Sequence, residues 1–166
     1  MENYICINGK KAELTEEQMK ALGIELPKVN PFARVDKAKN RGYYFINDTG
    51  RIISTPDMPN EFQCDDARYN IANYCTDKSI MEQRALHETL NRLLWRYSME
   101  HGGDEIEWKD TVKGYIYYNH EDNEFKVDGC IKWHYAGVTF LTKEIARNAI
   151  EEIIKPFMEA HPDFKW

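Results

Sequence analysis

The chain opens with a short apolar segment, Tyr4–Ile7, followed by the polar pair Asn8-Gly9. Asn-Gly tolerates the positive φ angles of a type I′ turn, so this pattern predicts a β-hairpin whose return strand ends near Leu14. Thr15–Gln18 then has the sequence of a capping box, in which two side chains satisfy the first backbone N–H groups of a helix. We expect a short helix here that ends at Gly23.

Two later aromatic-rich segments, each followed by a polar turn, predict two more hairpins. Their strand, turn and return segments are 42–46, 47–50 and 51–55 in the first, and 113–118, 119–123 and 124–127 in the second. Residues 68–74 are compatible with a strand or a helical turn, and the pattern favours a strand. A further strand is expected within 131–141, interrupted or turned near Ala136-Gly137.

Helical periodicity appears twice. A long helix is predicted from Thr76-Asp77 to about His101, because its apolar residues recur at helical spacing on one face. Those residues are Leu86, Leu90, Leu93, Leu94 and Tyr97. Arg84, Glu88, Arg92 and Arg96 step by four along another side, which predicts two opposite-charge pairs. Thr142 is expected to cap a final helix, which Pro156 should end or bend.

The two halves of the chain resemble each other in this layout. Gly42–Ile52 and Gly114–Phe125 share Gly-Tyr, an aromatic strand, Asn and a polar turn, and each is followed by a strand and a helix. We therefore predict an α+β fold with tandem β-β-β-α units. The expected segments are 1–42 (hairpin, short helix and connector), 43–103 (with the long helix) and 104–166, together forming one compact domain.

Composition narrows the class of protein. The 166 residues are 42% hydrophobic and carry a net charge of −6, and no apolar run approaches the length of about 18 residues that spans a bilayer. The N-terminus lacks the layout of a signal peptide, and the four cysteines form no C-x-x-C motif, so a reducing cytoplasm is expected. The acidic charge disfavours binding to phosphate backbones and favours basic partners.

The sequence HETLN, residues 87–91, resembles the zinc-protease motif H-E-x-x-H with its last ligand replaced by Asn91. Asparagine is a poor zinc ligand, and none of the remaining histidines follows in a known spacing. Those histidines are His101, His120, His134 and His161. We interpret the segment as a packing helix and expect no metal and no cofactor.

One nucleophile is placed where chemistry could activate it. Cys75 precedes a predicted helix N-terminus, whose dipole would lower the pKa of a thiol, and His134 or His87 could act as the base. A small Cys/His hydrolase is therefore one alternative. Cysteine is among the most buried residue types, so we favour a structural role for Cys75 and predict no catalytic residues.

Acidic residues cluster in the predicted turns and could serve as a docking surface. Carboxylates on a rigid scaffold can imitate phosphates to a protein with a basic surface. With two aromatic anchors, the candidate partner-binding residues are Asp104, Glu105, Glu107, Glu121, Asp122, Glu124, Tyr117 and Trp133.

The aromatic strands offer another interpretation. Rings that point outward from a strand could stack on bases, as in single-strand binders. The rings concerned are those of Tyr43, Tyr44, Phe45, Tyr115, Tyr117 and Tyr118. A nucleic-acid-binding accessory protein is therefore a second alternative, although the acidic charge disfavours it.

Several segments together resemble small proteins of phages and prophages of low-GC Gram-positive bacteria. They are YYFINDTGRI, ARYNIANYCTDK, RALHETLNRLLWRYSMEHGG and TKEIARNAIEEI. The resemblance implies a small protein that acts in the cytoplasm of the host bacterium and brings no assigned chemistry. Small phage proteins of this kind, without catalytic motifs, often resemble inhibitors of host defence in size and charge, including anti-CRISPR proteins.

The sequence thus predicts a non-enzymatic protein that binds a host defence or regulatory protein, such as a CRISPR nuclease, through that protein's basic surface. It would act as a monomer or homodimer, without contact to a membrane and without direct binding to nucleic acid.

Overall fold

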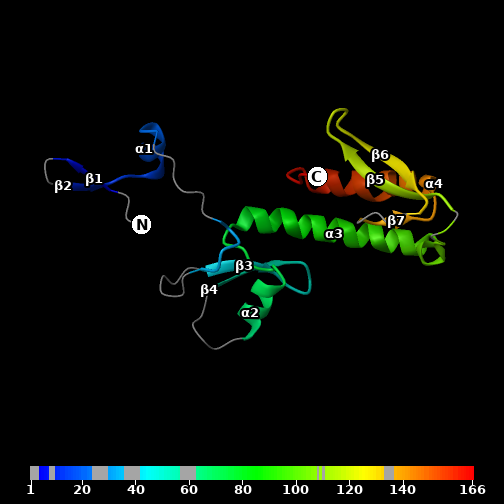
Figure 1. The fold of residues 1–166 in the computed structure, drawn as a ribbon, viewed down its shortest axis with the longest axis horizontal. Coiled ribbons are helices and arrows are strands. Elements are labelled where there is room, and N and C mark those ends of the chain that lie inside the picture. The colour runs from blue at the N-terminus through cyan, green and yellow to red at the C-terminus, as the bar shows by residue number, and fades with distance from the viewer. Residues whose placement is uncertain are drawn as a thin grey trace. The chain divides into compact units, whose positions relative to one another are not determined.

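The computed structural model describes residues 4–7, 10–23, 30–35, 42–56, 63–107, 109, 111–132 and 137–166. The fold is α+β, as predicted, with helices and three small antiparallel sheets (Figure 1). The chain divides into two compact units, residues 1–33 and 34–166, and each is considered by itself. Both β-rich segments predicted for 43–103 and 104–166 lie in the second unit.

The first unit holds the predicted hairpin and short helix. Strand β1, Tyr4–Ile7, pairs antiparallel with β2, Lys10–Glu13; the turn at Asn8-Gly9 lies outside the described residues. Helix α1, Glu16–Ala21, begins with the predicted capping box. The Thr15 N–H donates to Gln18 Oε1 at 2.9 Å, and the Gln18 N–H donates to Thr15 Oγ1 at 3.3 Å.

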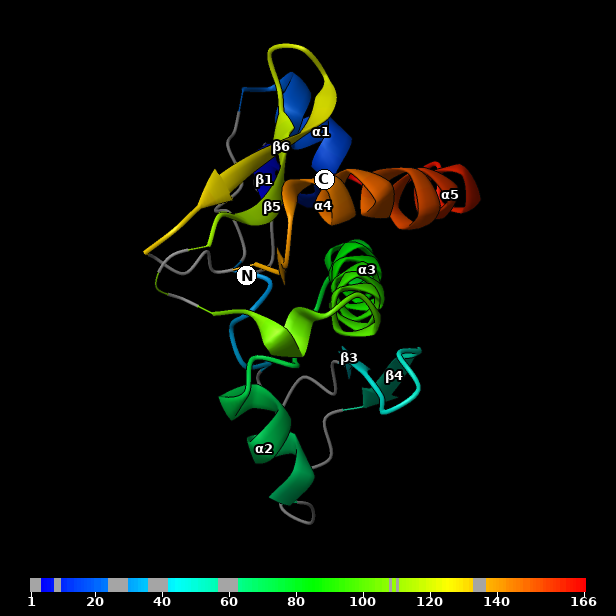
Figure 2. The same cartoon turned by 90° about the vertical axis from the view of Figure 1, so that its right-hand side faces the viewer.

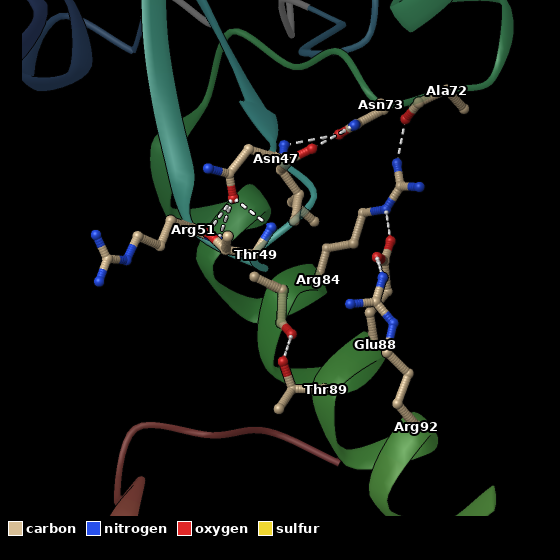
Figure 3. A network of polar contacts seen from close by, with 11 residues as sticks. Asn47, Thr49, Arg51, Ala72, Asn73, Arg84, Glu88, Thr89 and Arg92 are labelled. Atoms are coloured by element: carbon tan, nitrogen blue, oxygen red, sulfur yellow. Dashed lines mark hydrogen bonds and ion pairs between the residues drawn. The ribbon is translucent and has the colours of Figure 1, made fainter.

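The second unit begins its regular structure with the predicted second hairpin. Strand β3, Gly42–Ile46, pairs antiparallel with β4, Ile52–Pro56. The side chain of Asn47 holds the turn between them, because its Oδ1 accepts hydrogen bonds from the backbone N–H groups of Thr49 and Arg51 at 3.1 and 2.8 Å (Figure 3).

The strand predicted over residues 68–74 is wrong. Residues up to Asn70 belong to helix α2, Gln63–Asn70, and a turn follows in which Ala72 has a φ of +57°. A tertiary network selects the helix: Asp65 accepts a hydrogen bond from the Tyr43 hydroxyl, and Arg68 donates to both of these residues. This contact spans more than twenty positions of sequence and is invisible to a local pattern.

The segment after α2 is fastened by side chains. The amide of Asn73 donates to the Ile46 carbonyl at 2.7 Å and accepts from its N–H at 2.8 Å (Figure 3). The guanidinium of Arg84 donates to the carbonyl oxygen of Ala72 and to Glu88. The Asn73 contacts satisfy the backbone groups of Ile46 at the end of β3, and the Arg84 contact satisfies a carbonyl in the turn after α2.

Helix α3, Lys78–Glu100, is the predicted long helix. Asp77 is its N-cap, and Asp77 Oδ1 accepts hydrogen bonds from the N–H groups of Ser79 and Ile80 at 2.8 and 3.4 Å. Of the predicted apolar face, Leu90, Leu94 and Tyr97 are buried, and Leu86 and Leu93 are half-buried. The two predicted ion pairs are present, since both Arg84 and Arg92 contact Glu88.

The second β-rich segment forms a three-stranded sheet with the order β6-β5-β7. The predicted hairpin is present as β5, Lys113–Asn119, and β6, Glu124–Cys130. The strand expected within 131–141 is present, among the described residues, only as β7, Thr139–Phe140. Residues 133–136 lie outside the described part.

The last helical segment has three parts. Thr142 caps α4, Lys143–Ala149, as predicted, and its Oγ1 accepts from the Ile145 N–H at 3.1 Å. A π-helical segment, Ile150–Ile154, leads into α5, Lys155–Ala160. Pro156 therefore does not end the helix. A proline lacks an N–H and crowds the preceding turn, and the π-helical turn directly before it accommodates both effects.

Helix α3 serves as the spine of the second unit. Its first half packs on the β3–β4 hairpin through Met81 and Ala85, and its second half packs on the sheet and the C-terminal helices. Figure 2 looks along α3, with β3 and β4 on one side and β5, α4 and α5 on the other. Burial of the side chains in these clusters, at roughly 25 cal/mol per Å² of apolar surface, is the main source of stability. Because it packs on both sides, α3 holds the side chains of its remaining face in fixed positions.

A candidate docking groove on the long helix

The remaining face of α3 borders a groove with a volume of about 530 Å³. The other walls are the segment after α3 and the residues that lead into β7. The groove is lined by Glu88, Asn91, Arg92, Trp95, Ser98, Met99, Gly103, Ile106, Gly137, Val138 and Thr139. We name this site the Trp95 groove.

Apolar side chains are unusually exposed in the Trp95 groove. Trp95 is 60% exposed and Met99 is 37% exposed. They continue a row with Glu88 and Arg92, because positions 88, 92, 95 and 99 are three or four residues apart and share one side of a helix. A large aromatic ring in water, on a helix held in place by its other faces, is typical of an anchor in a protein interface.

The floor of the groove is closely packed and polar. Ser98 Oγ donates to the Thr139 carbonyl at 2.7 Å and so ties β7 to α3. Gly103 lies against the same serine, since a Cβ at this position would be 2.6 Å from Ser98 Oγ. The Thr139 hydroxyl is buried and has no hydrogen-bond partner within the described part of the chain. The floor therefore fixes the groove's shape.

One end of the groove carries unpaired carboxylates. Asp104 and Glu105 lie in a 3₁₀ turn, Gly103–Glu105, between two lining residues, and Glu107 follows directly. All three are exposed and form no ion pair with any described residue. We name these three residues the acidic rim. At the other end Glu88 is paired with Arg92 at 3.3 Å, so negative charge is concentrated at the rim.

The structure places the other predicted partner-binding residues elsewhere. Glu121 and Asp122 lie in the turn between β5 and β6, Glu124 begins β6, and Tyr117 lies in β5. Asp122 is neutralised by an ion pair with Lys126 and also accepts from Asn119 Nδ2 at 2.8 Å. Trp133 lies outside the described residues. The predicted set therefore separates into the acidic rim and the β5–β6 hairpin.

The residues of the hydrolase alternative are apart from each other. Cys75 is fully buried beside Ile46 and Met81, and its Sγ accepts from the Asp77 N–H at 3.4 Å. His87 is nine residues into α3, about 13 Å of helix rise from its first residue, and its ring contacts Phe164 with centroids 4.7 Å apart. His134 lies outside the described residues. Within the described part of the chain, no three His, Cys, Asp or Glu side chains lie close enough together to hold a metal ion.

The first aromatic strand directs its rings inward. Tyr43 is buried and stacks on Tyr74 with centroids 4.1 Å apart, and the guanidinium of Arg68 covers the ring of Phe45 at 3.7 Å. Burial, together with the hydrogen bond to Asp65, raises the pKa of Tyr43 to about 12. In the second hairpin Tyr117 is half-buried. Base stacking therefore has no fully exposed ring at these positions.

The sequence alone did not single out the Trp95 groove. The acidic rim was predicted from its charge, but Trp95 could not be distinguished from a core residue until the neighbouring walls were known. A usable signal does exist, because Trp95 lies one position beyond Leu94 and so falls outside the apolar stripe of α3.

Comparisons with known proteins found no relative: no protein-family model, curated protein or solved structure matches the chain. None of the described helices has an apolar stretch long enough to cross a bilayer.

Proposed function

We propose that this protein acts by binding another protein through the Trp95 groove, without catalysing a reaction. The observation that carries the proposal is an exposed tryptophan on α3, in a groove whose lining residues Gly103 and Ile106 neighbour the acidic rim. Its three carboxylates form no ion pair with a described residue. Aromatic residues, methionine and arginine are enriched at protein interfaces, and all three types occur in this groove as Trp95, Met99 and Arg92. Trp and Arg are also the residue types that dominate binding energy.

The chemistry of the groove suggests the chemistry of its partner. The acidic rim favours a basic surface, and the apolar row favours an inserted apolar side chain next to it. Together with the net charge of −6 and the resemblance to phage proteins, this supports a bacterial defence or regulatory protein, such as a CRISPR nuclease, as the target. Such a target presents basic surfaces that normally hold nucleic acid.

Imitation of a whole nucleic acid receives less support than local docking. Several exposed carboxylates are paired with a lysine four positions away, which divides the negative charge into short patches. Asp122, one of the predicted contacts, is among them. We therefore assign recognition to the acidic rim and the apolar row rather than to the overall charge.

The proposal can be tested by measuring binding to purified CRISPR effector nucleases at low salt. Trp95→Ala should weaken binding by about thirtyfold or more, the loss typical of a central interface residue. The control is Ile71→Ala, which removes an equally exposed apolar side chain, 68% exposed, outside the groove. Equal losses from both variants would contradict the groove, and no binding at micromolar concentration would count against this class of target.

Charge reversal tests the acidic rim separately. The paired change Asp104→Lys and Glu105→Lys should weaken binding and reduce its dependence on salt, because attraction to a basic partner is screened by ions. Glu159→Lys is the control, an exposed carboxylate on α5 that is not part of the rim. A gel-shift assay with single-stranded DNA and RNA distinguishes the nucleic-acid alternative, which requires binding without a partner protein.

A further inference from the structure

We propose that a second copy of this chain pairs with the free edge of β6, so that two molecules form one continuous sheet in a symmetric dimer. This surface is distinct from the Trp95 groove and does not depend on the function proposed for it. The edge of β6 is exposed, its backbone groups point outward, and its charges are ordered so that they match those of a second copy.

Strand β6 is an open edge. It is the outer strand in the order β6-β5-β7 and pairs only with β5 among the described residues. Residues 123–127 line a groove of about 690 Å³ whose other wall is formed by α4 and the π-helical segment, at Arg147 and Ile150. One face of the strand packs on the core through Phe125 and Val127, and among the described residues no second strand pairs with the edge.

The backbone of the edge is ready to pair. In an antiparallel ladder the N–H and C=O groups of successive residues point alternately toward the partner strand and away from it. The Gly129 N–H donates to the carboxylate of Asp128 at 2.7 Å, which indicates that this N–H points away from β5. By alternation, the outward groups are those of Phe125, Val127 and Gly129. Unpaired groups of this kind form a template for another strand.

The sequence of β6 is complementary to itself in one register. When the strand pairs antiparallel with a copy and Val127 lies on the twofold axis, all seven residues, 124–130, overlap. Lys126 then lies opposite Asp128 of the second copy, and this pair occurs twice. Opposite charges and β-branched residues in directly opposed positions stabilise a pair of strands. The residue on the axis, Val127, is also one whose backbone groups point outward.

The neighbouring register is unfavourable. With Lys126 on the axis, the two copies of this lysine face each other, and Glu124 faces Asp128. Like charges in directly opposed positions destabilise a sheet. A lysine on an edge strand commonly prevents association. Here Asp128, two residues after Lys126, supplies an opposite charge. The lysine therefore disfavours the register with Lys126 on the axis and favours the register with Val127 on the axis.

The internal ion pairs do not prevent this arrangement. Lys126 contacts Asp122, and Asp128 contacts Lys143 at 3.2 Å, but all four side chains are partly exposed. Exposed pairs of this kind contribute little to stability, so exchange for partners across the axis has a small cost. The N–H of Gly129 would exchange the Asp128 carboxylate for a carbonyl of the second copy.

Sedimentation and light scattering of the full chain test the proposal, and the wild type should be a dimer at micromolar concentration and low salt. Lys126→Asp places like charges opposite each other twice and should raise the dissociation constant at least tenfold. The same holds for Asp128→Lys. The double variant, with both changes in one chain, restores the pairs and should restore the dimer.

A mixture of the two single variants gives the most decisive test of the register. The Lys126→Asp chain and the Asp128→Lys chain, each impaired alone, should form a mixed dimer with each other, because every opposed pair is then opposite in charge. Asp122→Asn is the control, since it removes the internal partner of Lys126 and should leave the dimer intact.

Two outcomes would overturn the proposal. One is a monomeric wild type under these conditions, which would leave the edge to a strand of another protein or to none. The other is a dimer that Lys126→Asp does not weaken, which would place the contact elsewhere. Circular dichroism of each variant separates lost association from lost folding.

Discussion

Tyr44 and Cys75 exchange two backbone hydrogen bonds: the Tyr44 N–H donates to the Cys75 carbonyl at 2.7 Å, and the Cys75 N–H donates to the Tyr44 carbonyl at 3.1 Å. This isolated antiparallel bridge stands where the second half of the chain has β7. In each half the bridging residue, Cys75 or Phe140, precedes the N-cap of the following helix by two positions.

The two halves thus share a hairpin, a third pairing with the first strand of that hairpin, and a helix. They differ in two respects. Helix α2 lies between hairpin and bridge in the first half, whereas the described residues between β6 and β7 form no helix. The bridging residue pairs with Tyr44, two residues after Gly42, in the first half, but with Gly114 in the second half. The similarity noticed in the sequence therefore corresponds to the same order of pairing with a shifted register.

The burial of the Cys75 side chain predicts how its thiol reacts. Its thiol is fully buried, as is that of Cys130, whereas Cys64 is exposed on α2. A thiol reagent applied to the native protein should therefore modify Cys64 rapidly and the two buried cysteines only after unfolding. Peptide-level mass spectrometry at successive times measures each site separately.

The same measurement bears on the hydrolase alternative. Urea-unfolded protein is the control, in which Cys64, Cys75 and Cys130 should all react at comparable rates. Rapid modification of Cys75 in the folded chain would contradict its burial and would favour an activated thiol at the start of α3.

The elements predicted correctly are those specified by nearby residues. The side chains of Thr15, Asp77 and Thr142 each accept a hydrogen bond from an N–H group two or three positions later in the sequence. The helix N-termini are therefore specified by residues close together in the sequence. The hairpin turns are equally local, as Asn47 demonstrates. These signals gave the fold class and most element boundaries.

The incorrect strand at 68–74 and the features that the sequence did not specify depend on distant contacts. Helix α2 is selected by the contact of Asp65 and Arg68 with Tyr43, more than twenty residues earlier. Strand β7 is held by Ser98, 41 positions before its partner Thr139. The Trp95 groove likewise needs three separate segments. The charge of the acidic rim was visible in the sequence, but the side chain beside it was not.

The groove floor gives a prediction about stability. Thr139 Oγ1 is buried without a hydrogen-bond partner among the described residues, so Thr139→Val replaces it with a methyl group of similar size and relieves the cost of desolvation. The free energy of unfolding should rise by about 1 kcal/mol. The comparison is Ser98→Ala, which removes the hydrogen bond to the Thr139 carbonyl and should lower it by about 1 to 2 kcal/mol. Urea denaturation measures both. A destabilised Thr139→Val variant would mean that the hydroxyl has a partner, such as a bound water.

The approach of β5 to α4 gives a second prediction about stability. A Cβ at Gly114 would lie 2.6 Å from the Thr142 carbonyl oxygen and 2.9 Å from Lys143 Cα, both of them backbone atoms. Gly114→Ala should therefore destabilise the protein by about 1 to 3 kcal/mol through overpacking. Gly129→Ala is the matched control on β6, because there the nearest atoms are the movable ends of Lys143 and Val112. Thermal unfolding of the two variants should differ clearly, and equal losses would contradict the contact with α4.

The network at α2 predicts how stability depends on alkaline pH. Burial is the main reason that the pKa of Tyr43 is raised from 10.0 to about 12, followed by the hydrogen bond to Asp65. A raised pKa means that the folded state favours the protonated phenol. The contribution of the protonated Tyr43 phenol to the free energy of unfolding is therefore complete below pH 10.0. It is lost as the pH rises from 10.0 through about 12. A shift of this size corresponds to about 2 to 3 kcal/mol.

Tyr43→Phe isolates this contribution. The variant should be less stable at neutral pH, since Asp65 loses a buried donor, but its free energy of unfolding should fall less steeply above pH 10.0 than that of the wild type. Tyr69→Phe on α2, where the ring is exposed, is the control and should retain the wild-type slope. Absorbance of tyrosinate during an alkaline titration gives an independent measure, because Tyr43→Phe removes one late-ionising phenol. Identical slopes in all three proteins would mean that Tyr43 ionises as freely in the folded chain as in the unfolded one, and the network with Asp65 and Arg68 would then not fix α2.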